Sequence, residues 1–66
     1  MSRIRDLRMK KGLSISKLSQ VAGVNASVVS WAELGKLAAS PAVRTTLSNF
    51  YGEAEEELFL KNGMAI

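Results

Sequence analysis

The stretch "SISKLSQVAGVNASVVSWAELG", residues 14–35, has the pattern of two short helices separated by a very tight turn. Ser14 and Asn25 are residue types that cap helix starts, and apolar residues follow each of them at helical spacing. Gly23 and Gly35 then stand where each helix is expected to end. So short a turn forces the two helices to cross at a steep angle and to share a core. The stretch therefore predicts a pair of crossed helices.

Further helices are predicted on both sides of this pair. Residues 3–11 carry an apolar stripe, and Pro41 suits the first turn of a helix that is expected to end at Gly52. Residues 53–60, "EAEEELFL", begin with acids, as the helix dipole favours, and predict a brief fifth helix. Residues 61–66 are expected to be a frayed end, unless a partner buries their apolar side chains. No segment has a strand pattern, so the predicted fold class is all-α, a compact bundle of five helices.

Composition narrows the possible functions. The 66 residues are the length of one domain, residues 1–66, and they include no Cys and no His. The chain therefore lacks the side chains of a disulfide, a zinc finger, a thiol nucleophile or an imidazole base, so we expect no metal and no cofactor, and an enzyme is the least favoured class. The apolar runs are far below the roughly 20 residues of a membrane span, and no signal-like block begins the chain. We expect a cytoplasmic protein with no membrane contact.

Charge is distributed unevenly along the chain, whose formal net charge is +3. Residues 1–13 are strongly basic, whereas residues 53–60 carry only acidic charges. A polyanion such as nucleic acid would be steered toward the basic end, but a solvated surface helix explains a charge cluster equally well. Charge alone leaves both interpretations open.

Four segments together carry a family resemblance. They are "IRDLRMKKGLS", "LSQVAGV", "VVSWAELGK" and "YGEAEEELF", in register with the spacing of the glycines over nearly the whole chain. This arrangement resembles the lambda-repressor-like (Cro/C1-type, XRE) helix-turn-helix family. The resemblance implies a DNA-binding domain whose helix-turn-helix spans about residues 14–34, with the helix over residues 26–34 in the major groove.

The same resemblance implies the residues that would touch DNA. Val29 and Ala32 face inward by their spacing, and the outward positions that match the family's base readers are Ala26, Ser27, Ser30 and Trp31. None of these four is an Arg, Asn or Gln that could make a bidentate contact with a base, so weakly polar readout is expected. The implied phosphate contacts are Ile15 through its backbone amide, Lys17, Asn25, Lys36 and Arg44.

Trp31 departs from the family pattern, which often has a long polar or basic side chain at this position. Its indole could pack on thymine methyl groups in the groove. It could instead fold back over Val28 or Ile15 as a partial lid on the core, or form the centre of a protein interface. Ile15 also departs from the family, which commonly has Gln there. An exposed apolar patch could include Ile15, Trp31, Leu34 and Leu37, although Leu37 is better explained as filling a gap beneath the fourth helix.

Arg8 and Glu33 match a further family feature, an ion pair that links the first helix to the end of the third. Such a partly buried pair adds little net stability, yet deletion of one partner would leave an unpaired charge.

The leading functional hypothesis is a sequence-specific DNA-binding transcriptional regulator, a repressor or Cro-like protein of phage or mobile-element type. It would act on double-stranded DNA as a homodimer, at least when bound. The alternative keeps the fold but makes it a protein-interaction module, such as an antitoxin or a repressor antagonist, with a partner on the surface of Trp31 and Leu34.

Overall fold

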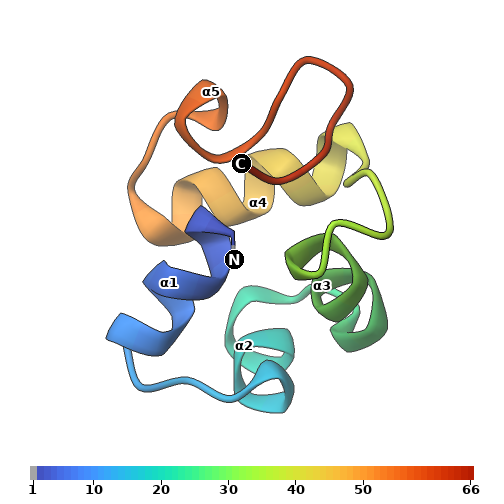
Figure 1. The fold of residues 1–66 in the computed structure, drawn as a ribbon. Coiled ribbons are helices and arrows are strands. Elements are labelled where there is room, and N and C mark those ends of the chain that lie inside the picture. The colour runs from blue at the N-terminus through green and yellow to red at the C-terminus, as the bar shows by residue number, and fades with distance from the viewer. Residues whose placement is uncertain (1) are drawn as a thin grey trace.

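Five helices and their short connections make up the computed structural model, which describes residues 2–66. The helices are α1 (Arg3–Lys10), α2 (Ile15–Ala22), α3 (Ala26–Glu33), α4 (Pro41–Tyr51) and α5 (Glu55–Leu58). Figure 1 shows α4 and α5 on one side of the molecule and α2 and α3 on the other, with α1 beside them. The predicted all-α fold of five helices is confirmed.

The helix starts are those that the polar residues of the sequence predict. The side chains of Ser14, Asn25 and Ser40 each accept a hydrogen bond from a backbone N–H in the first turn of the following helix. These bonds satisfy amides that would otherwise have no partner at the end of a helix. Ser2, which is buried, caps α1 in the same way by accepting from Arg5 N.

The core is formed by apolar side chains from every helix and from the α2–α3 turn. Leu18 of α2, Val29 of α3 and Leu47 of α4 are at most 1% exposed, and Val24 in the turn is also buried. The turn is possible because Gly23 ends α2 with a φ of 72°, in the left-handed region that side chains disfavour. Val21 lies outside this core, since half of it is exposed.

The C-terminal segment is ordered, and the expectation of a frayed end is wrong. Phe59 and Ala65 form an isolated antiparallel bridge, and Leu60 N donates to Met64 O at 2.7 Å. Ile66 N donates to Leu58 O at 2.9 Å, while Ile66 O accepts from Arg3 N of α1 at 2.6 Å. The segment therefore returns from α5 across the molecule (Figure 1).

This return also explains why α5 is shorter than predicted. The acids at the start of residues 53–60 do begin a helix, but Phe59 is extended and its ring is buried. The backbone that follows pairs with the C-terminal segment, so it cannot continue the helix. Among residues 2–66, no helix has the length and apolar character needed to cross a membrane.

Candidate nucleic-acid interface

The geometry of the site begins with the turn between α2 and α3. Val24 is buried beneath the turn, and its carbonyl oxygen accepts a hydrogen bond of 2.5 Å from the Ser19 hydroxyl. The turn is thereby fixed from α2 by a side chain and from the core by apolar packing. This role of Ser19 was not predicted from the sequence. The signal that could have indicated it is a Ser five residues before Val24, within reach of the carbonyl of the turn. The two helices are consequently held as one unit.

Asn25 fixes the start of α3. Its Oδ1 accepts from the backbone N–H groups of Ser27 and Val28, at 2.9 and 3.1 Å. The oxygen of the side chain is thus used in capping, which leaves the amide NH2 as the part able to donate to a phosphate. Asn25 is exposed, so this group is accessible to a ligand.

The inward and outward faces of α3 are clearly divided. Val29 and Ala32 are buried, at 1% and 0% exposure, whereas Trp31 is 54% exposed. Ser27 is exposed, and the other two predicted base readers, Ala26 and Ser30, are half-buried. More than half of Trp31 is open to solvent, and its three interpretations stay predictions: a contact in the groove, a partial lid over Val28 or Ile15, and a protein contact.

The exposed apolar surface beside α3 is smaller than the sequence predicted. Ile15 is half-buried and packs against the core, and Leu37 is also half-buried. Neither residue is therefore fully exposed, and only Ile15 packs directly against the core. Trp31 and Leu34, which is 62% exposed, remain. We call these two side chains the α3 apolar pair.

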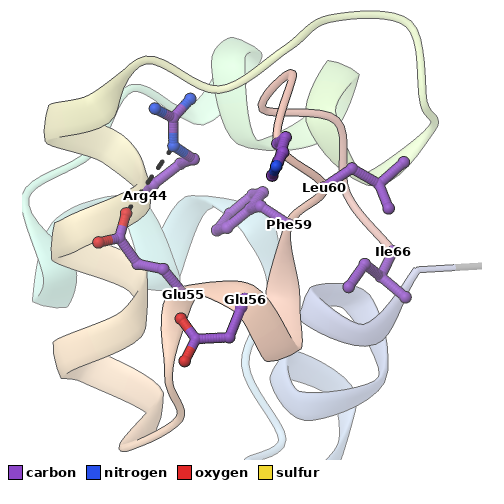
Figure 2. A pocket seen from close by; sticks show the side chains of 7 residues that line it. Arg44, Glu55, Glu56, Phe59, Leu60 and Ile66 are labelled. Atoms are coloured by element: carbon purple, nitrogen blue, oxygen red, sulfur yellow. Dashed lines mark ion pairs between the residues drawn. The ribbon is translucent and has the colours of Figure 1, made fainter.

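The predicted phosphate contacts differ in their surroundings. Lys17, in the first turn of α2, and Lys36, just after α3, are both exposed. The backbone N–H of Lys36 donates to Trp31 O at 2.9 Å, so this cation follows directly on the end of α3. Arg44 is instead drawn toward α5: its Nη1 donates to Ala39 O at 2.5 Å, and its Nε lies 3.8 Å from a Glu55 carboxylate oxygen. Figure 2 shows this inward arrangement.

Arg8 and Glu33 form the ion pair that the family resemblance implied. Arg8 Nε and Nη2 donate to the two carboxylate oxygens of Glu33, at 2.9 and 3.1 Å, and both residues are 7% exposed. Arg8 Nη1 also donates to Leu13 O at 2.7 Å. The hydrogen bonds with Glu33 raise the pKa of Arg8, so the guanidinium stays charged. One side chain thus joins α1, the α1–α2 connection and the end of α3.

Comparison with known proteins agrees with this geometry. A family model described as a helix-turn-helix domain matches residues 2–59. The chain belongs to this family, which is of the XRE/lambda-repressor-like type. Searches of curated proteins and of solved structures gave no match. Membership indicates a DNA-binding regulator.

One hollow lies elsewhere on the helix-turn-helix domain. It has a volume of about 430 Å³ and is lined by α4, α5 and the C-terminal segment, without residues of α2 or α3. Figure 2 shows the ring of Phe59 within it, Arg44 facing Glu55, and Leu60 and Ile66 at its side. Its wall carries Glu55 and Glu56 beside Arg44 and Lys61, so the hollow has no excess of positive charge to attract a polyanion such as DNA. The candidate site is therefore the surface of α3.

Proposed function

We propose that this helix-turn-helix domain, residues 1–66, is a sequence-specific transcriptional regulator that inserts α3 into the major groove of double-stranded DNA. The observation that carries the proposal is the division of α3 into a buried face and an exposed face that includes Trp31. The eight residues of α3 span about 12 Å, which is similar to the width of the major groove. The accessible face is thus of the right size for the groove.

The proposed contacts divide into two groups. The side chains for base edges are Ala26, Ser27, Ser30 and Trp31, and the groups for phosphates are the Ile15 amide, Lys17, Asn25 and Lys36. Lys17 and Lys36 supply the charge, because both are exposed. Arg44 is a weaker candidate, since its guanidinium is already held by Ala39 O and Glu55. Phosphate contacts would set the affinity, and the face of α3 would set the sequence.

The oligomeric state, location and mode of action that we propose are those expected of a helix-turn-helix regulator. We expect a cytoplasmic homodimer on DNA, because regulators of this geometry bind two half-sites that are about 34 Å apart or a multiple of that. Occupancy of such a site would block polymerase, as a repressor or Cro-like protein of a phage or mobile element does. Selection of bound duplexes from a random pool tests these features together, since an inverted repeat at that spacing is the expected product.

A salt titration of binding to random duplex DNA tests the proposal directly. The logarithm of the binding constant should fall linearly with the logarithm of salt concentration, with a slope of roughly 0.9 for each phosphate neutralised. Lys36→Gln should reduce the slope by about 0.9 per subunit, whereas Lys61→Gln, at the hollow beside α5, should leave it unchanged. Lys61 is a matched control because it is also exposed. Absence of binding even at low salt would refute the proposal.

A second candidate is a protein-interaction module, such as an antitoxin or a repressor antagonist. The observation that favours it is the α3 apolar pair, because Trp31 and Leu34 expose 54% and 62% of their surface. Exposed aromatic residues are common at the centres of protein interfaces. Association that persists at high salt, without any binding to DNA, would favour this candidate.

A further inference from the structure

The outer face of α3 carries no charge that is free to meet a base. The one charged residue of the helix, Glu33, is buried and held by both arms of the Arg8 guanidinium. The sequence of α3, "ASVVSWAE", also lacks Arg, Lys, Asn and Gln. These are the side chains that make bidentate contacts with G or A in the major groove. Hydrogen-bonding readout by α3 is therefore confined to two Ser hydroxyls and the single N–H of the indole.

The outer face of α3 is suited mainly to apolar contacts. Trp31 has the largest side chain of the outer face, and 54% of it is exposed. Ser27 lies one turn before it on the same face, and Ala26 adds a methyl group at the start of the helix. The surface thus offers a broad ring and a small methyl, with little polar competition around them.

The major groove presents one apolar group to such a surface. It is the methyl group on C5 of thymine, and 5-methylcytosine carries the same methyl at the same ring position. Cytosine and uracil have only hydrogen there. A surface with a large indole and no bidentate donor should therefore distinguish methylated from unmethylated pyrimidines better than it distinguishes purines.

We propose that α3 reads C5-methyl groups of pyrimidines, with Trp31 as the residue that determines this specificity. This inference rests on the proposed function, since it requires α3 in the major groove. Lys36 supports the proposal, because it is exposed and its backbone N–H donates to Trp31 O, so a cationic side chain branches from the backbone just after the turn that carries Trp31. One buried methyl should strengthen binding roughly four-fold, from the transfer free energy of one carbon.

The test measures binding to two pairs of duplexes by fluorescence anisotropy at one fixed salt concentration. The first pair is an alternating A·T duplex and the same duplex with deoxyuridine in place of thymidine. The second pair is an alternating G·C duplex with cytosine or with 5-methylcytosine. Within each pair the phosphates are the same, so the ratio of the two affinities isolates the methyl group. The expected result is tighter binding, roughly four-fold or more, to the methylated member of both pairs.

Two variants show whether Trp31 is responsible. Trp31→Ala should bring both ratios to one while its salt dependence on the A·T duplex stays that of the parent, since the phosphate contacts are retained. Leu60→Ala is the matched control, because Leu60 is also 54% exposed but lies at the hollow beside α5. It should keep both ratios. Circular dichroism of each variant verifies that the helices are intact.

Each other outcome overturns the inference. Equal affinity within both pairs means that DNA is bound without reading the methyl, and the proposed function survives. A preference in the thymine pair alone would mean that α3 reads thymine in its A·T context and not the C5-methyl group of pyrimidines in general. Absence of binding to all four duplexes at low salt removes the proposed function as well. Self-association lost in Trp31→Ala would then assign the indole to a protein contact.

Discussion

The aromatic side chains on the two sides of the molecule differ in how far they are buried. On the side of α4 and α5, Tyr51 and Phe59 are buried, and the rings of Phe50 and Tyr51 meet edge to face with centroids 5.3 Å apart. On α3, Trp31 stays 54% exposed. Burial of an aromatic side chain is a large source of stability in a chain this short. The aromatic side chains of α4 and of Phe59 thus contribute to the core, whereas more than half of Trp31 is left in contact with solvent.

The largest effect on stability is expected at Arg8, which links α1 to the end of α3. Arg8→Ala would leave the Glu33 carboxylate buried without its partner, so the free energy of unfolding should fall by about 3 to 5 kcal/mol. Urea unfolding followed by circular dichroism measures it. Arg3→Ala is the matched control: Arg3 pairs with Glu53 at 3.2 Å, but its side chain is 47% exposed, and the change should be below about 1 kcal/mol.

A double variant shows whether the loss of stability comes from the unpaired Glu33 carboxylate or from the lost packing of the Arg8 side chain. When Arg8→Met and Glu33→Met are combined, no buried charge remains, so the double variant should be more stable than Arg8→Met or Glu33→Met alone. A double variant as unstable as Arg8→Ala would contradict the assignment of the effect to the unpaired carboxylate.

The next largest effect is expected at Gly63, in the C-terminal segment. A Cβ at this position would lie 2.8 Å from Ala39 O and 2.6 Å from Arg44 Nη1, and the φ of 90° is already unfavourable for a side chain. Gly63→Ala should lower the free energy of unfolding by about 3 kcal/mol, as backbone strain and overpacking combine. Gly12→Ala, where φ is 70° and no atom lies within 4 Å, should cost only about 1 kcal/mol. Equal losses would show that the C-terminal segment is not held closely.

A smaller effect of opposite sign is expected at Tyr51. Its hydroxyl is buried without a hydrogen-bond partner among the described residues, so Tyr51→Phe should raise the free energy of unfolding by about 1 kcal/mol at neutral pH. Burial raises the pKa of Tyr51 from 10.0 to about 12. The unfolded chain therefore ionises first, and the stability that Tyr51 retains below pH 10.0 is lost as pH rises toward about 12.

The pH dependence gives the Tyr51 prediction an independent check. The advantage of Tyr51→Phe over the parent should widen above pH 10.0, since Phe does not titrate and only the parent is affected. Urea midpoints for both chains at several alkaline pH values measure this. A constant difference across the range would mean that the hydroxyl is solvated in the folded state.

The smallest effect on stability is expected at Trp31. Trp31→Ala should change the free energy of unfolding by no more than about 0.5 kcal/mol, as exposed sites usually do. A loss of about 3 kcal/mol, which is typical of a buried aromatic, would erase the contrast between the two sides of the molecule. Thermal unfolding of the same protein samples that are used for DNA binding provides the measurement.

The parts of the fold that are local in sequence could be predicted from it. Ser14, Asn25 and Ser40 cap their own first turns, so the starts of three helices follow from adjacent residues. The C-terminal segment could not be predicted, because two of its hydrogen-bond partners, Arg3 of α1 and Ala39, are distant in the chain. Periodicity carries no information about such backbone pairing. The length of α5 was missed for the same reason.

The candidate site was predictable to the level of faces but not of individual partners. Helical spacing separated Val29 and Ala32 from Trp31, and the structure has that division. The surroundings of Arg44 were not predictable, because they depend on the approach of Glu55 and of the Ala39 carbonyl through the tertiary fold. The partial burial of Ile15 depends likewise on core residues that the tertiary fold brings against it.

The C-terminal segment has a practical consequence for work with fragments of this chain. The family match stops at residue 59, yet Ile66 accepts a hydrogen bond from Arg3 and donates one to Leu58, and Gly63 O accepts from Ala39 N. A truncation at the edge of the match would remove these partners of Arg3, Leu58 and Ala39, together with the bridge between Phe59 and Ala65. Excised versions and fusions should accordingly retain the last seven residues and attach any tag through a spacer beyond them.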